Sequence, residues 1–208
     1  MSRYNRFTRS NKQINIVGWI DETIYPELDV LIKNKEIIIK ELQNLLDKKK
    51  WHQYSLGKQT IEETSILNSK KCLVYNLIVD KKILPESNFS PLTIQLLKKV
   101  CLDNIINASY LCIESYATTH RQHYKDAYFY RCHIPLIVPL GNCFLEVEGE
   151  KKIWASKPLV FDPKFYHDFW NYTPDPLFVL VVDLVKKEKI YSTPVNRLAH
   201  FKKKKSDK

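Results

Sequence analysis

The sequence predicts an α+β fold in which helices pack on one side of a β-barrel. Two amphipathic helical patterns lie in the first half of the chain, at residues 26–46 and 90–101. Short runs with period-two alternation follow, at residues 131–171, and turn residues separate them. Because the helices come first and the strands last, the two kinds of element are segregated rather than interleaved, which is typical of an α+β domain.

A chain of 208 residues is long enough for one domain with a substantial core. We expect a flexible basic arm at residues 1–18 and a basic tail at residues 191–208. Between them we expect a single domain at residues 19–190, with a helical lead-in at 26–104 and a barrel at 106–185.

Charge and cysteine content indicate the compartment and the kind of partner to expect for this chain. The five cysteines are scattered without CxxC spacing, which favours free thiols in a reducing compartment. No signal peptide or membrane-spanning run is recognisable, so we expect a cytoplasmic protein. The net charge of +10 favours an anionic partner, bound weakly through the terminal FKKKKSDK. The alternative for that lysine run is a solvated tail.

The first helix is predicted from Pro26 to Leu46, because apolar residues recur at intervals of three and four and proline suits the first turn. Residues 51–65 have no clear pattern. Residues 72–79 are rich in β-branched and aromatic side chains, so they form either a strand or a segment buried under a helix. Ser90 followed by Pro91 begins the second helix.

The barrel strands follow in order. Pro135 lies inside one of them, which suits an edge strand or a bulge because proline cannot donate to the ladder. The last strand is apolar throughout and is therefore expected to be buried on both faces. The predicted strands are residues 108–116, 131–139, 143–148, 151–155, 159–162, 167–171 and 177–184.

Four polar side chains are placed to meet inside such a barrel. Arg131 and His133 lie two apart on one strand and so share a face. His123 and His167 lie at the two ends of the run of strands. Neutral imidazoles from different strands are common transition-metal ligands. The alternative is that these histidines are hydrogen-bonded core or surface residues.

An inward guanidinium at Arg131 needs an anion to offset its loss of hydration. A dicarboxylate ligand would supply one. A salt bridge to Asp162, Asp168 or Asp183 would do so equally well.

The motifs of residues 123–183 resemble those of the aspartyl/asparaginyl β-hydroxylase family. They are H-x(7)-R-x-H-x-P-L from His123 to Leu136, P-x(3)-C from Pro139 to Cys143, Trp154, F-D-x-x-F-x-H-x-x-W-N from Phe161 to Asn171, and the apolar run that ends in Val182 and Asp183. The likeness covers most of residues 20–185. The resemblance implies a double-stranded β-helix, a jelly-roll or cupin-like barrel, that binds Fe(II), 2-oxoglutarate and O₂.

The resemblance also implies residue roles. His123 and His167 would hold the iron, while Arg131 and His133 would line the 2-oxoglutarate pocket. Asp126 or water would complete the metal site, with the cationic Lys125 turned outward. His120 is a rival to His123, but the spacing to Arg131 and His133 favours His123.

Two positions depart from the family pattern. The arginine expected ten residues after the second histidine is Leu177, and Cys112 stands where some members contact the cosubstrate through a serine. The resemblance implies a hydroxylase of an amino-acid residue or small substrate, with protein, free amino acid and lipid as the alternatives. The alternative is a non-catalytic or altered-cosubstrate barrel that acts as a binding module.

Overall fold

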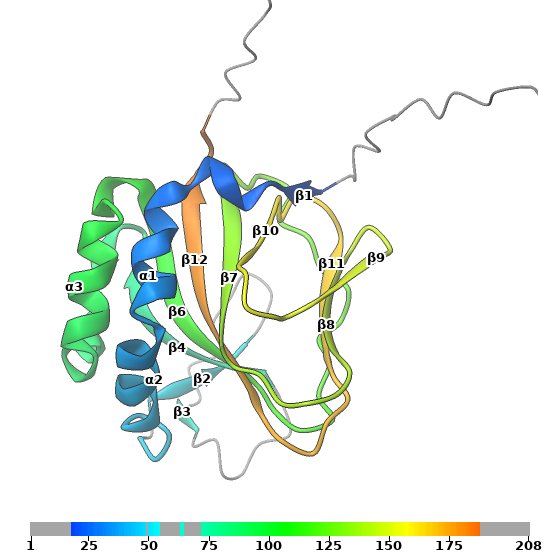
Figure 1. The fold of residues 1–208 in the computed structure, drawn as a ribbon, viewed down its shortest axis with the longest axis horizontal. Coiled ribbons are helices and arrows are strands. Elements are labelled where there is room, and N and C mark those ends of the chain that lie inside the picture. The colour runs from blue at the N-terminus through cyan, green and yellow to red at the C-terminus, as the bar shows by residue number, and fades with distance from the viewer. Residues whose placement is uncertain (1–17, 49, 55–62, 65–71, 188–208) are drawn as a thin grey trace, which may run out of the picture.

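The structure is a computed structural model that describes residues 18–48, 50–54, 63–64 and 72–187. Two antiparallel sheets face each other, one of nine strands and one of three (Figure 1). Helices cover the outer face of the large sheet, and the small sheet faces its inner side. This arrangement confirms the α+β prediction and has the two-sheet architecture of a jelly roll.

The large sheet runs in the order β1-β10-β7-β12-β6-β4-β2-β3, with β5 paired to β4. Its strands are β1 (Trp19–Ile20), β2 (Trp51–Gln53), β3 (Glu63–Thr64), β4 (Cys72–Val79), β5 (Lys82–Ile83), β6 (Ile105–Ile113), β7 (Phe129–Ile137), β10 (Leu159–Phe161) and β12 (Leu177–Val185). The small sheet, in the order β11-β8-β9, contains β8 (Cys143–Val147), β9 (Glu150–Ile153) and β11 (His167–Asn171).

The first predicted helix is divided in the structure. A 3₁₀ turn at Pro26–Leu28 leads into α1 (Asp29–Lys33) and then α2 (Lys35–Gln43). The break falls at Asn34, whose backbone leaves the helical region at φ −109° and ψ 22° and whose side-chain amide donates to the Val30 carbonyl at 2.7 Å. Asparagine competes for backbone hydrogen bonds in this way, which weakens a helix interior.

The second helix is α3 (Pro91–Lys99), as the Ser90–Pro91 signal indicated. Short 3₁₀ segments flank these elements at Glu22–Ile24, Pro85–Phe89 and Leu102–Asn104. Within the part of the chain that the structure describes, no helix has the length and apolar character that crossing a membrane requires.

Pro135 lies at an irregular point inside the sheet. Strand β7 is not an edge, because it pairs with β10 on one side and β12 on the other. The register between β7 and β12 shifts between Phe178 and Val179, and Val179 is the residue opposite Pro135. Of the two predicted settings for this proline, the structure has the bulge.

The central strands bury both faces, and each face belongs to a different core. Even-numbered residues of β12 such as Leu180 pack with the helices, whereas odd-numbered ones such as Val179 pack with the small sheet. Asp183 lies directly opposite Arg131, and Val181 lies opposite His133. Arg131 and His133 are therefore on the inner face, between the sheets, as their spacing predicted.

Candidate functional site

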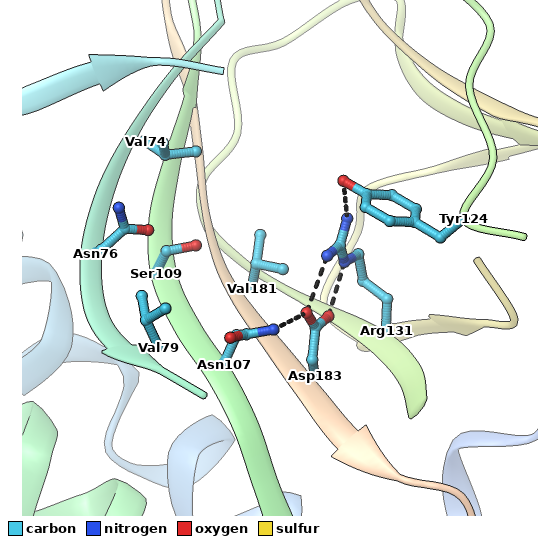
Figure 2. Close-up of a pocket in the computed structure, with 9 residues that line it drawn as sticks. All are labelled: Val74, Asn76, Val79, Asn107, Ser109, Tyr124, Arg131, Val181 and Asp183. Atoms are coloured by element: carbon cyan, nitrogen blue, oxygen red, sulfur yellow. Dashed lines mark hydrogen bonds and ion pairs between the residues drawn. The ribbon is translucent and has the colours of Figure 1, made fainter. Parts of the chain in front are cut away.

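A cavity of about 380 Å³ lies on the inner face of the large sheet. Strands β4, β6, β7 and β12 supply most of its wall, and Figure 2 shows the side chains that point toward it. The lining residues are Val74, Asn76, Val79, Asn107, Ser109, Tyr124, Arg131, Val181 and Asp183. The cavity therefore combines an apolar floor with amide, hydroxyl and charged groups.

The strongest interaction in the cavity is a two-pronged ion pair. Arg131 donates from Nε to Asp183 Oδ1 at 2.7 Å and from Nη2 to Oδ2 at 2.9 Å (Figure 2). Burial alone would lower the pKa of Arg131, but Asp183 raises it well above its usual value, so the guanidinium stays charged. Of the anions that could offset this charge, the structure places Asp183 beside it.

Further hydrogen bonds hold this pair in place. Asn107 Nδ2 donates to Asp183 Oδ2 at 2.9 Å. Arg131 Nη1 donates to the hydroxyls of Tyr54 and Tyr124, each at 3.3 Å. The Asp183 carboxylate and all three guanidinium nitrogens of Arg131 thus bond protein groups, and the pair is rigidly oriented.

Gln122 extends the same network toward the small sheet. Its Nε2 donates to the Tyr54 hydroxyl at 3.1 Å, and its side chain is buried. The Tyr54 hydroxyl also lies 3.4 Å from that of Tyr124. Burial raises the pKa of Tyr54, so its phenol stays protonated and can donate.

His133 lies deeper, among aromatic rings. Its ring is parallel to that of Trp154, with 6.1 Å between centroids, and it contacts Phe161 and Phe169 at 5.4 and 5.2 Å. Both ring nitrogens are buried without a hydrogen-bond partner. Burial, and then the charge of Arg131, hold the pKa of His133 well below its usual value, so the ring is neutral.

His167 has one ring nitrogen engaged and one without a partner. Nδ1 lies 2.9 Å from the Phe165 carbonyl oxygen, which can only accept, so Nδ1 carries the hydrogen. Nε2 is buried and has no partner. Burial lowers the pKa of His167 to about 4. This tautomer and charge state leave a lone pair on Nε2, as a metal ligand requires.

His123 lies on the other side of the same backbone. Gln122 and His167 exchange two backbone hydrogen bonds, Gln122 N to His167 O at 2.9 Å and His167 N to Gln122 O at 2.8 Å. Directly paired residues share a face, and the next residue along points the opposite way. His123 is accordingly exposed, and its ring packs on Tyr166 at 4.4 Å between centroids.

The residues present do not fit a two-histidine iron centre. The inner face offers His167 Nε2, but the second proposed ligand, His123, is outside. The other residues considered near the first ligand, His120, Lys125 and Asp126, are also exposed. No group of three or more His, Cys, Asp or Glu side chains is placed to hold a metal ion within residues 18–48, 50–54, 63–64 and 72–187.

The two positions that depart from the family pattern are both buried in apolar surroundings. Leu177 has no exposed surface and packs in the inner core with Leu111 and Val179. Cys112 packs in the core beneath the helices, with Tyr110 and Leu180. The structure therefore does not bring Cys112 to the inner cavity. The hydroxyl that β6 presents there is Ser109.

Sequence reasoning missed the inward residues Gln122, Tyr54, Tyr124 and Asn107. One signal could have found two of them, because Gln122 and Tyr124 are spaced for one face of an extended segment. Tyr54 lay in a stretch without a readable pattern. Its role depends on the pairing of β2 with β4, which no local pattern specifies.

A family model described as aspartyl/asparaginyl beta-hydroxylase matches residues 21–187. The chain is also 38% identical over 69 residues to the ornithine lipid ester-linked acyl 2-hydroxylase of Rhizobium tropici, a match that covers 32% of this chain and 25% of that protein. The chain thus spans about a quarter of the length of this relative.

Two solved structures are similar in part. One is an oxidoreductase of the 2OG-Fe(II) oxygenase family from Burkholderia pseudomallei, with a TM-score of 0.45, 12% identity, and coverage of 78% of this chain and 92% of that one. The other is the cupin domain of Schizosaccharomyces pombe Cnp3, with a TM-score of 0.38, 8% identity, and coverage of 62% and 77%.

The family match spans the helical lead-in and both sheets, and it includes every cavity residue from Val74 onward. On these grounds the chain belongs to the aspartyl/asparaginyl β-hydroxylase family.

Proposed function

We propose that this member of the hydroxylase family is an altered barrel that binds a small neutral or zwitterionic ligand in the Arg131–Asp183 cavity. One observation carries the proposal: the cation that could receive an acidic ligand is already neutralised by a buried carboxylate. A dicarboxylate such as 2-oxoglutarate would bring two negative charges beside Asp183, where low polarity strengthens the repulsion.

The cavity wall is suited to a compact polar ligand. Asn76 and Ser109 present an amide and a hydroxyl from the neighbouring strands β4 and β6, on the same face of the large sheet as the ion pair (Figure 2). The valines between them bury an apolar portion of the ligand. A zwitterion such as an amino acid would place its ammonium near Asp183 and its carboxylate near Arg131, so that the site as a whole remains neutral.

The test is a binding survey by isothermal titration calorimetry and thermal shift, with free amino acids, small amides, succinate and 2-oxoglutarate. We expect a zwitterionic or neutral compound to bind, and Ser109→Val and Asn76→Leu to weaken it. We expect no saturable binding of 2-oxoglutarate at millimolar concentrations. Tight binding of 2-oxoglutarate that Arg131→Gln abolishes would overturn the proposal.

A second candidate is the Fe(II)- and 2-oxoglutarate-dependent hydroxylase that the family implies. It is favoured by family membership and by the unpartnered Nε2 of His167. This candidate keeps the roles that the family resemblance implies: His123 and His167 would hold the iron, Arg131 and His133 would bind the cosubstrate, and the substrate would be an amino-acid residue, a free amino acid or a lipid acyl chain. It requires His123 to turn inward from the exposed position that it has in the structure.

Turnover separates the two candidates. The protein is incubated with Fe(II), ascorbate, 2-oxoglutarate and each class of substrate, and succinate is measured by mass spectrometry. Substrate-dependent succinate that is lost in both His123→Ala and His167→Ala would favour the hydroxylase. Background succinate in every sample, unchanged by the two substitutions, would favour the altered barrel.

A further inference from the structure

We infer that Gln122, and not His123, occupies the inward position that a second imidazole would need, so that the single substitution Gln122→His completes a two-histidine metal site with His167. The inference concerns metal binding alone and does not depend on the ligand proposed above. Its test can therefore fail while that proposal stands, and the reverse is also true.

The backbone pairing decides which side chain faces inward. The two hydrogen bonds between Gln122 and His167 make them a directly opposed, hydrogen-bonded antiparallel pair. Side chains of such a pair leave the same face with their Cβ atoms about 5 Å apart. Two imidazoles at this separation can reach one ion. The ring of His123 begins on the opposite face, and a rotamer change alone does not bring it through the backbone.

Side-chain contacts agree with this reading. Gln122 points inward, since it is buried and bonded to the Tyr54 hydroxyl. Tyr124, two residues later, also points inward, because its ring lies parallel to that of His167 at 6.0 Å. An alternation of in, out and in across residues 122–124 leaves the outward place to His123.

On the outside of the sheet, His123 belongs to a cluster of surface side chains. Its ring packs on Tyr166, whose other contacts include the guanidinium of Arg121 at 4.8 Å from the ring centroid. Arg121 pairs in turn with Glu148 at 3.6 Å. His123 therefore has a structural partner on the outside of the sheet, which accounts for this histidine without a metal.

The remaining half of the site is already prepared. The Phe165 carbonyl fixes the proton of His167 on Nδ1, and Nε2 is buried without a partner. Replacing the Gln122 side chain by imidazole adds a second nitrogen ligand from the facing position. The substitution loses the hydrogen bond from Gln122 to the Tyr54 hydroxyl, which still accepts from Arg131 Nη1.

The experiment uses tag-free full-length protein and Co(II), with Ni(II) and Mn(II) in parallel. Binding is measured by calorimetry and by the visible absorption of Co(II). We expect wild-type protein to bind weakly or not at all, and Gln122→His to bind one equivalent at least about tenfold more tightly, equivalent to about 1.4 kcal/mol. The double variant Gln122→His with His167→Ala should lose this gain, and Gln122→His with His123→Ala should keep it.

Three results would overturn the inference. The first is stoichiometric metal binding by wild-type protein that His123→Ala abolishes. The second is a folded Gln122→His, judged by its circular dichroism and cooperative melting, that binds no more tightly than wild type. Should Gln122→His fail to fold, Gln122→Glu places a carboxylate in nearly the same volume, and the absence of any His167-dependent gain in that variant is the third.

Discussion

The two faces of the large sheet differ in how they treat buried polar groups. Alternate residues of the same strands build both faces, so the difference does not come from having different strands on the two sides. On the helix side, polar groups are few and paired. On the inner side, an ion pair, two neutral histidines and a glutamine share the space between the sheets.

The helix side shows how a fully satisfied core is made. The Glu41 carboxylate accepts the backbone N–H groups of Leu92 and Thr93 at 2.8 and 2.7 Å, and also the Thr93 hydroxyl at 2.7 Å. The Thr93 hydroxyl lies 2.8 Å from that of Tyr110. Free N–H groups at the start of α3 are thereby paired, which stabilises the junction of α2, α3 and β6.

The inner side keeps nitrogens without partners. His133 has two and His167 has one, although both side chains are almost wholly buried. Such groups cost stability and are uncommon in a core. The comparison teaches that the unpaired polar groups gather on the inner face, and departures of this kind are expected at functional or strained sites.

The largest expected effect comes from breaking the inner ion pair. Asp183→Ala leaves Arg131 charged and buried without its anion, so we expect a loss of about 3 to 5 kcal/mol in the free energy of unfolding. Urea denaturation measures it. Asp29→Ala removes the exposed pair with Lys33 and serves as the control, with an expected loss below about 1 kcal/mol. Equal losses of unfolding free energy in the two variants would contradict a buried Arg131–Asp183 ion pair on the inner face.

A smaller effect is expected from acidification. The pKa of His167 is lowered from 6.5 to about 4 in the folded chain. Between these values the unfolded chain binds more protons than the folded one, so stability falls as the pH drops from 6.5 towards 4. The contribution of His167 is on the order of 3 kcal/mol.

The measurement is urea denaturation at several pH values between 7 and 4. His167→Phe should lose less stability over this range than wild type, since phenylalanine cannot be protonated. His120→Gln changes an exposed histidine and should follow the wild-type profile. Identical profiles for all three proteins would show that His167 is not buried as a neutral ring.

The smallest expected effect comes from removing unpaired nitrogens from the inner face. His133→Phe replaces a buried ring with two unpartnered nitrogens by an apolar ring of similar size, among Trp154, Phe161 and Phe169. We expect a change within about 1 kcal/mol, and of stabilising sign. Thermal and urea melts measure it. A loss above about 2 kcal/mol would mean that the His133 nitrogens make a stabilising contact.

Much of the fold could be predicted because its signals are local. The period-two runs anticipated the small sheet, with β11 predicted at its observed bounds, residues 167–171, and the continuous apolar run at residues 177–184 anticipated β12. Pro135 predicted either an edge strand or a bulge, and the structure has the bulge. The break at Asn34 was not foreseen, since the apolar pattern of residues 26–46 continues across it. The predicted arm, tail and terminal lysine run lie largely outside the described residues, so the expected anionic partner stays a prediction.

The candidate site was predictable only in part. The spacing of Arg131 and His133 placed both on one face, because alternation along a strand is a property of the strand alone. The choice among three aspartates for Arg131 needed the register between β7 and β12. The choice between Gln122 and His123 as the inward neighbour of His167 also needed a register, that of the bridge between Gln122 and His167. A motif counts positions along the chain, and a shift of one residue in pairing turns a side chain to the other face.

By itself the sequence determined the order of helices and strands, the family, and the face that Arg131 and His133 share. These follow from periodicity and from residue types at fixed spacing. Only the tertiary structure decided that Asp183 neutralises Arg131, that Gln122 faces His167 and that His123 lies outside. Such facts depend on which strands pair and in what register, and that is settled by burial across the whole molecule.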